Sequence, residues 1–176
     1  MAPVLAKVKE TLGDIIYGID TDSLENTVIH LLKEQGKTLA TAESCTGGML
    51  SKRLTDIPGA SKVYIGGAVA YSEQSKIKLL GIAPDLIQKK GAVSSEVALA
   101  MADGIRLKLG ADIGIGITGI AGPDSDSSGQ EPGTMYIALT TKDISLCDKP
   151  RLTYDRDRIR IAAASNALDM LRRLLS

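Results

Sequence analysis

Apolar residues recur with two different periods along the chain, which predicts helices separated by short strands. A spacing of three and four positions, often preceded by a serine or proline and closed by a glycine, is typical of amphipathic helices. It predicts helices at 23–36, 49–54, 72–80, 84–90, 94–109 and 156–175. Short apolar runs predict strands at 38–42, 63–71, 111–118, 134–141 and 143–154, the last two paired as a hairpin. Gly66 and Gly67 predict a bulge or a close backbone approach in the second strand.

This order of elements predicts a single α/β domain with three layers, α/β/α, around a mixed sheet. A length of 176 residues fits one domain. We place that domain at residues 23–176 and treat residues 1–22 as an N-terminal extension. The extension has apolar residues at helical spacing, namely Val4, Leu5, Val8 and Leu12. They predict a short amphipathic helix and a following loop, with a role in packing or in a dimer contact.

Composition excludes several classes of function. Basic and acidic residues each number 21, so the net charge is zero, and we expect neither nucleic acid nor a membrane as partner. The five Tyr are the only aromatic residues, which argues against a stacking platform for single strands. Cys45 and Cys147 are too few and too unpatterned for a disulfide framework or a metal site. Without a signal peptide or a long apolar run, the sequence predicts a cytoplasmic protein with reduced thiols.

The segment from Glu43 to Gly48 is the first candidate for chemistry. A strand runs into a glycine-bearing turn and then a helix, so a hydroxyl stands at the strand end beside free backbone amides. Ser44, Cys45 and Thr46 are all nucleophile candidates, and the alternative is that the hydroxyls merely cap the helix. The only histidine, His30, lies in another predicted helix and is not expected to be catalytic. A serine nucleophile therefore needs a Lys, Asp, Glu or Tyr as its base.

A second segment offers such a base. Tyr71 ends a predicted strand, and Lys76 follows in the first turns of a helix. Because strand ends gather at one edge of an α/β sheet, Ser44 and Lys76 could meet there. Lys76 would then act as a base only if burial or a neighbouring cation lowered its pKa. The alternative for a single lysine is an ordinary solvated side chain.

Two further segments carry weaker signals. The buried strand that includes Thr118 ends at Gly119 in a glycine loop, which suits either an anion or a tight turn. It is followed by Pro123 and polar residues, so it is not a dinucleotide fingerprint. Arg156 begins the last helix, where a guanidinium suits a phosphate, and the alternative is a solvated charged turn.

Taken together, these motifs resemble a known family. The chain carries, in order, the strings AESCTGG from Ala42, YS from Tyr71 with Lys76, GAVS from Gly91, GIAGP from Gly119, GT from Gly133 and DR from Asp155. It is similar over residues 23–175 to the nicotinamide-nucleotide amidases, also known as the CinA C-terminal domain. The resemblance implies hydrolysis of nicotinamide mononucleotide to nicotinate mononucleotide and ammonia, without metal or cofactor, by a homodimer.

The resemblance also implies roles for individual residues. Ser44 matches the nucleophile and Lys76 the general base, with Tyr71 assisting proton transfer. Residues that we expect to contact the substrate are Glu43, Cys45, Thr46, Gly47, Gly48, Thr118, Gly119 and Arg156. Among them, the amides of Thr46 to Gly48 are the expected oxyanion donors, and Arg156 the expected phosphate ligand.

Two departures from the family pattern fall near the expected phosphate end. Tyr154 stands where glycine is usual, and Gln130-Glu131-Pro132-Gly133 replaces Lys-Pro-Val-Gly. Two other interpretations therefore remain open: a silent module that binds a nucleotide or a partner protein, and an amidase for another small amide.

Overall fold

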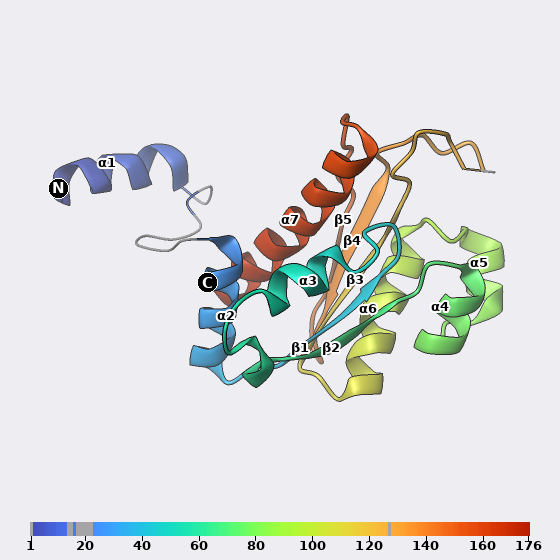
Figure 1. The fold of residues 1–176 in the computed structure, drawn as a ribbon, viewed down its shortest axis with the longest axis horizontal. Coiled ribbons are helices and arrows are strands. Elements are labelled where there is room, and N and C mark those ends of the chain that lie inside the picture. The colour runs from blue at the N-terminus through green and yellow to red at the C-terminus, as the bar shows by residue number, and fades with distance from the viewer. Residues whose placement is uncertain (1, 14–15, 17–22, 127) are drawn as a thin grey trace.

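A five-stranded mixed sheet forms the centre of the molecule, in the order β2-β1-β3-β4-β5 (Figure 1). The computed structural model describes residues 2–13, 16, 23–126 and 128–176. The strands are β1 (Leu39–Glu43), β2 (Tyr64–Val69), β3 (Ile113–Gly119), β4 (Met135–Thr140) and β5 (Ser145–Asp148). β1 runs parallel to β2 and β3, whereas β4 is antiparallel to both β3 and β5. The predicted mixed sheet is confirmed.

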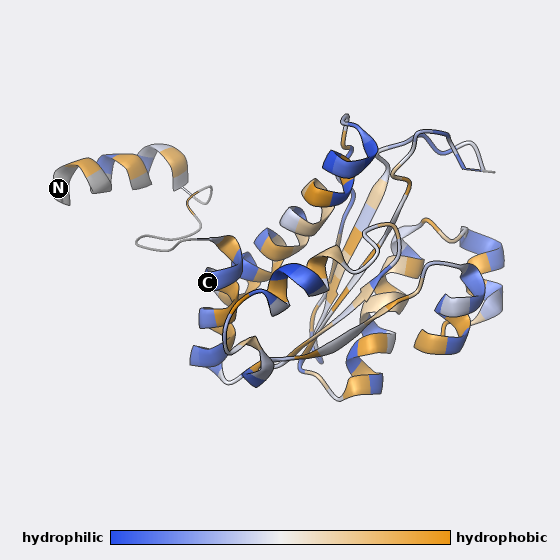
Figure 2. Cartoon of the chain, viewed as in Figure 1, coloured by the Kyte–Doolittle hydropathy of each residue, from blue (hydrophilic) through white to orange (hydrophobic). Residues whose placement is uncertain are grey.

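Helices cover both faces of this sheet, which confirms the predicted three-layer α/β domain. One layer holds α2 (Leu24–Gln35), α3 (Met49–Thr55) and α7 (Arg156–Leu175). The other holds α4 (Glu73–Leu80), α5 (Pro84–Lys90) and α6 (Ser95–Leu109). A short 3-10 helix, η2 (Ala60–Lys62), precedes β2. Apolar stripes on these helices turn toward the sheet (Figure 2), so a buried cluster fills each interface.

The helix boundaries follow from local capping. The hydroxyls of Ser23, Ser72 and Ser94 each accept the backbone N–H three residues further on, at the starts of α2, α4 and α6. Glycines in the left-handed conformation close the same three helices, at Gly36, Gly81 and Gly110. These are the start and stop signals that the sequence carries, which explains why the predicted boundaries agree with the structure.

Small residues allow α6 to lie directly on β3. A Cβ atom added at Gly114 would come within 2.1 Å of the Ala102 carbonyl oxygen, and one at Gly116 within 2.3 Å of that of Ala98. The intervening Ile115 points to the opposite core. The alternation of glycine and isoleucine thus lets α6 pack closely on one side of β3 while the isoleucines fill the core on the other side.

Both alternatives predicted for Gly66 and Gly67, a bulge and a close backbone approach, occur in β2. The pairing of β1 with β2 shifts register between Leu39 and Ala40, as at a β-bulge. At Gly67 an added Cβ would lie 2.2 Å from the hydroxyl oxygen of Thr41, so the backbone approaches that side chain closely. By contrast, the strand predicted at 143–154 is wrong in length. β5 ends at Asp148, because Pro150 cannot donate to the ladder.

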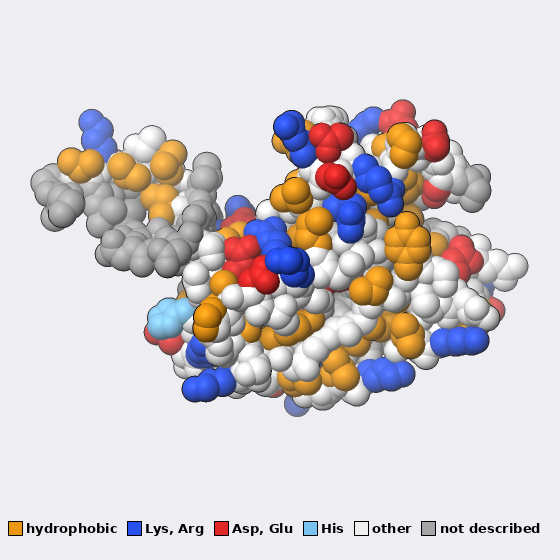
Figure 3. Space-filling view, viewed as in Figure 1, with side chains coloured by type: hydrophobic (Ala, Val, Ile, Leu, Met, Phe, Trp, Pro, Cys, Tyr) orange, Lys and Arg blue, Asp and Glu red, His pale blue; other side chains and the backbone are white. Residues whose placement is uncertain are grey.

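The N-terminal extension contains the predicted helix, α1 (Ala2–Leu12). Its apolar residues Val4, Val8 and Leu12 are exposed. The loop predicted after it falls mainly on residues 14–15 and 17–22, outside the described residues. None of the helices in the described ranges has the length and apolar character that crossing a bilayer requires. On the face seen in Figure 3, charged side chains of both signs mix around the start of α7.

Candidate active site

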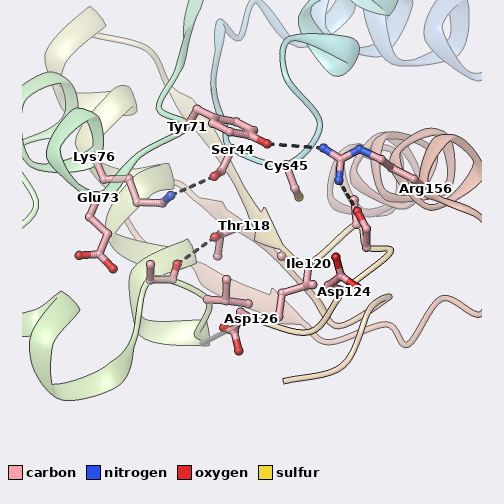
Figure 4. A pocket seen from close by; sticks show the side chains of 15 residues that line it. Ser44, Cys45, Tyr71, Glu73, Lys76, Thr118, Ile120, Asp124, Asp126 and Arg156 are labelled. Atoms are coloured by element: carbon pink, nitrogen blue, oxygen red, sulfur yellow. Dashed lines mark hydrogen bonds between the residues drawn. The ribbon is translucent and has the colours of Figure 1, made fainter. Parts of the chain in front are cut away.

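The candidate site is an open cavity of about 350 Å³ at the carboxyl ends of β1, β2 and β3 (Figure 4). That volume is in the range of small-ligand sites. Three predicted residues reach it from these strand ends: Ser44 after β1, Tyr71 after β2 and Thr118 in β3. Lys76 of α4 and Arg156 of α7 complete the wall. Ligands of α/β proteins bind at this edge of the sheet.

Ser44 and Lys76 form a buried hydrogen-bonded pair in the cavity wall. The Lys76 Nζ donates to Ser44 Oγ over 2.9 Å and to the carbonyl oxygen of Ala70 over 3.2 Å. Only 3% of Lys76 and 6% of Ser44 is exposed. Burial lowers the pKa of Lys76, and the opposing influences of Cys45 and Glu73 are smaller. Burial thus makes the Lys76 amine easier to deprotonate than that of a solvated lysine, and an amine hydrogen-bonded to a hydroxyl is the arrangement of a base and a nucleophile.

Cys45 lines the same cavity, but its chemistry differs. The residue is 7% exposed, and its thiol lies 3.5 Å from the sulfur of Met135. Burial raises the pKa of Cys45 to about 11, although the amides of Cys45 and Thr46 and the nearby Lys76 lower it. At neutral pH the group is therefore a thiol, and a thiol is a poor nucleophile.

We expect Cys45 to resist alkylation in the folded protein. Treatment with iodoacetamide at neutral pH, followed by peptide mass mapping, should leave Cys45 unmodified, because alkylation needs an accessible thiolate. In denaturant Cys45 should react readily, which serves as the control. Rapid labelling of Cys45 in the native state would contradict the buried-thiol description.

Glu43 does not line the cavity, contrary to the expectation of a substrate contact. It is fully buried, and its carboxylate accepts the N–H groups of Gly48, Leu50 and Ser51 over 2.8–3.1 Å. It also accepts the Ser51 hydroxyl over 2.6 Å. A carboxylate at the start of α3 satisfies amides that a helix leaves free. Glu43 therefore fixes the shape of the turn that carries Ser44.

The expected set of oxyanion donors also changes. The Gly48 N–H is occupied by Glu43, and the Gly47 N–H donates to the carbonyl oxygen of Ser44 over 3.0 Å. Thr46, Gly47 and Gly48 do not line the cavity. Within the described residues, the N–H groups of Cys45 and Thr46 have no oxygen acceptor. Both lower the pKa of the Cys45 thiol, so both point toward the Cys45 sulfur.

Tyr71 and Arg156 meet at the outer rim of the cavity. Arg156 donates to the carbonyl oxygen of Gly122 over 2.5 Å and to the Tyr71 hydroxyl over 3.5 Å (Figure 4). Both side chains are exposed, and Tyr71 makes no hydrogen bond to the Ser44–Lys76 pair among the described residues. The geometry thus places the Tyr71 hydroxyl beside Arg156. The role of Tyr71 in assisting proton transfer stays a prediction.

On the opposite wall, the end of β3 supplies Thr118 and Gly119. The Thr118 hydroxyl donates to the carbonyl oxygen of Ala92 over 2.9 Å, which ties β3 to the segment before α6. At Gly119 an added Cβ would lie 2.0 Å from the sulfur of Met135. Both predicted residues border the cavity, and the glycine is needed there because of tight packing.

The sequence reasoning missed three carboxylates in the cavity wall, those of Glu73, Asp124 and Asp126. Asp124 directly follows the GIAGP string, which was the available signal. Hydrogen bonds from the Ser128 hydroxyl and neighbouring amides hold Asp126 in its loop and lower its pKa despite burial.

The residues that depart from the family pattern lie outside the cavity lining. Gln130 donates to the carbonyl oxygen of Val93 over 3.0 Å, and Glu131 pairs with Arg151. Tyr154 is exposed and is likewise absent from the lining. His30, also exposed, pairs with Glu34 on α2.

The fold and the site together define an α/β domain with a buried serine–lysine pair at the carboxyl edge of its sheet. The CinA C-terminal domain family matches residues 21–175, and the chain belongs to this family. Its relatives include a CinA-like protein of Acidobacterium capsulatum, 47% identical over 97% of this chain and 41% of that protein. Another is a putative competence-damage inducible protein of Caldanaerobacter subterraneus subsp. tengcongensis, 44% identical over 99% of this chain and 42% of that protein. This chain thus spans about two fifths of such relatives.

Solved structures show the same fold. A CinA superfamily protein of Klebsiella pneumoniae 700603 aligns with a TM-score of 0.85 at 32% identity, over 86% of this chain and 95% of that one. The competence/damage inducible protein CihA of Agrobacterium tumefaciens aligns with a TM-score of 0.84 at 33% identity, over 92% and 99% of the two chains.

Proposed function

We propose that this chain is an amidase that hydrolyses the carboxamide of nicotinamide mononucleotide, with Ser44 as nucleophile and Lys76 as base. The observation that carries the proposal is the buried hydrogen bond of 2.9 Å between Lys76 Nζ and Ser44 Oγ in an open cavity. Membership of the CinA C-terminal domain family supports it, since that family includes amidases of this nucleotide.

The proposed reaction proceeds through an acyl-enzyme. Neutral Lys76 takes the Ser44 proton as Oγ attacks the carboxamide carbon, which gives a tetrahedral oxyanion. The Lys76 ammonium then returns the proton to the departing amine, and ammonia leaves. Water, activated by the again neutral Lys76, attacks the ester and releases nicotinate mononucleotide. The lowered pKa of Lys76 suits both proton transfers.

The N–H groups of Cys45 and Thr46 are the proposed donors to the oxyanion. They adjoin the nucleophile in the chain and have no oxygen acceptor among the described residues. Fixed donors of this kind stabilise the negative charge that develops in the transition state. This assignment replaces the Thr46-to-Gly48 set that the sequence predicted.

The charges around the cavity suit a substrate that is both a cation and an anion. Nicotinamide mononucleotide joins a pyridinium cation to a phosphate. Glu73, Asp124 and Asp126 supply negative charge in the wall, and Arg156 supplies an exposed guanidinium at the rim. A guanidinium matches the geometry of a phosphate, and carboxylates favour a cationic ring. The pattern supports this nucleotide over a neutral amide.

The direct test is ammonia release by the purified chain. We expect turnover of nicotinamide mononucleotide and much slower turnover of free nicotinamide, glutamine and asparagine. Hydrolysis of another amide in preference would overturn the substrate assignment. Binding of the nucleotide by folded protein without ammonia release would instead favour a silent binding module.

The Arg156→Gln variant tests the phosphate contact. We expect its KM for nicotinamide mononucleotide to rise about tenfold or more, because a hydrogen bond between charged groups contributes roughly 1.5–3 kcal/mol. Nicotinamide riboside, which lacks the phosphate, should be turned over equally by wild type and variant. Arg158→Gln, an exposed arginine in the same turn of α7, is the matched control. An unchanged KM would place the phosphate elsewhere.

A further inference from the structure

Arg160 contacts the nucleophile turn from the side of α7, although neither the sequence patterns nor the family resemblance singled it out. Its Nε donates to the carbonyl oxygen of Cys45 over 3.1 Å, and its Nη2 to that of Thr46 over 3.0 Å. The Arg160 side chain is 27% exposed, and its Nη1 lies 3.7 Å from a carboxylate oxygen of Asp157. One guanidinium thus holds two successive peptide groups, Cys45–Thr46 and Thr46–Gly47.

Fixing these carbonyls also fixes the N–H groups. In a trans peptide the C=O and N–H point in opposite directions. The carbonyl of Cys45 shares its peptide group with the Thr46 N–H, so Arg160 directs that N–H away from α7. The Thr46 carbonyl shares its peptide group with the Gly47 N–H, which donates to the Ser44 carbonyl oxygen over 3.0 Å. The Ser44 carbonyl in turn belongs to the peptide group that carries the Cys45 N–H.

We propose that Arg160 is a positioning residue that aligns the amides of Cys45 and Thr46 as oxyanion donors beside Ser44. The proposal rests on the serine hydrolase function proposed above. Arg160 fixes the Thr46 N–H directly, by binding the Cys45 carbonyl of the same peptide group. It fixes the Cys45 N–H indirectly, through the hydrogen bond from the Gly47 N–H to the Ser44 carbonyl oxygen. It is absent from the residues that line the cavity, so its effect on the reaction runs through the backbone of the turn.

The contact between Arg160 and the turn depends on a glycine at position 47. Its φ is +60°, a conformation that side chains rarely adopt. A Cβ atom there would lie 3.1 Å from Arg160 Nη2, the atom that binds the Thr46 carbonyl. Glycine therefore leaves the room in which the guanidinium sits. On the other side of the turn, the Glu43 carboxylate holds Gly48, so the segment is fixed at both ends by charged groups.

The two bonds need the shape of arginine and not only its charge. A guanidinium presents planar N–H donors in a fixed fork, whereas a lysine ammonium is a compact charge on a flexible stem. Lysine at this position would keep the positive charge near the turn, but one ammonium cannot reproduce the planar two-point contact. Comparing Arg160→Lys with Arg160→Met therefore separates alignment from charge.

Nicotinamide mononucleotide turnover gives the first measurement. We expect Arg160→Lys to lower kcat about 10- to 100-fold with KM within about threefold of wild type, since misplaced donors weaken transition-state binding. Arg160→Met should lose as much or more. Added guanidinium ion should restore part of the turnover of Arg160→Met. Arg158→Gln, on the exposed side of the same helix, is the control and should match wild type.

Labelling of Ser44 by a fluorophosphonate probe gives a second readout that does not depend on the substrate. We expect wild type and Arg158→Gln to label at Ser44 and Arg160→Lys to label at least about tenfold more slowly, with thermal unfolding used to verify folding. Labelling without nucleotide turnover in wild type would overturn the proposed substrate and leave this comparison valid. Equal labelling and equal kcat in Arg160→Lys and Arg158→Gln would overturn the positioning role. A wild type that neither labels nor turns over would overturn both proposals.

Discussion

Substitution of Lys76 by methionine is expected to lower the kcat for nicotinamide mononucleotide by about 10³-fold, which is within the usual contribution of a general base. Methionine fills similar space in the buried site but cannot take the Ser44 proton. In wild type, kcat/KM should rise with pH through the lowered pKa of Lys76, because only the neutral amine is a base. Steady-state kinetics across the pH range measure both effects. Activity that persists in Lys76→Met, or falls as the pH rises, would contradict the assignment.

The same variant should be more stable than wild type at neutral pH. Because the pKa of Lys76 is lowered in the folded state, the unfolded chain binds more protons between that pKa and about 10.4, and stability rises with pH in this window. Below the folded pKa the full cost of burying the lysine is present, and methionine removes it. The stability difference should therefore be largest below the folded pKa of Lys76 and shrink as the pH rises toward about 10.4.

Chemical denaturation of the two proteins at several pH values measures this difference. Lys78→Met, an exposed position on the same helix, is the control and should show no comparable gain. A loss of stability in Lys76→Met at neutral pH would mean that Lys76 stabilises the fold. A buried active-site lysine that lowers the stability of the fold is an example of the common trade-off between activity and stability.

Ser44→Ala should abolish ammonia release, with a loss of more than about 10³-fold, because the covalent route is removed altogether. Cys45→Ala should keep most of the turnover, since its raised pKa of about 11 leaves a thiol that does not attack. The two residues are adjacent in the same turn, so the pair forms a matched comparison. Mass spectrometry of quenched reactions should find the acyl group on Ser44 in wild type. Loss of turnover in Cys45→Ala with retention in Ser44→Ala would make the cysteine the nucleophile.

Much of the fold follows from local sequence. The spacing of apolar residues and the serine and glycine caps fix α2, α4 and α6, because a helix end is decided by a few neighbouring residues. The continuous apolar character of residues 111–118 predicts a buried strand, and β3 lies at the centre of the sheet. The end of β5 at Asp148 was missed, because the apolar pattern continued past Pro150, which interrupts the ladder.

The candidate site could be predicted in part. Strand ends placed Ser44, Tyr71 and Thr118 at one edge, since parallel strands bring their carboxyl ends together. The pattern could not tell which backbone amides stay free. Glu43 was expected to contact the substrate, yet it faces the start of α3 and takes the Gly48 N–H. Such pairings depend on the fold of the turn and leave no periodic signal in the chain.

The sequence by itself determined most of the elements and their order, the three-layer α/β domain with its mixed sheet, and the place of Ser44, Tyr71 and Thr118 at the sheet edge. Only the tertiary structure decided the chemistry of those residues. Lys76 meets Ser44 across 32 positions, and its pKa falls because the packed fold excludes water from the amine. Arg160 reaches the same turn from a helix more than a hundred residues further along the chain. Periodicity reports local conformation, whereas burial and hydrogen-bond partners are set by segments that meet only after folding.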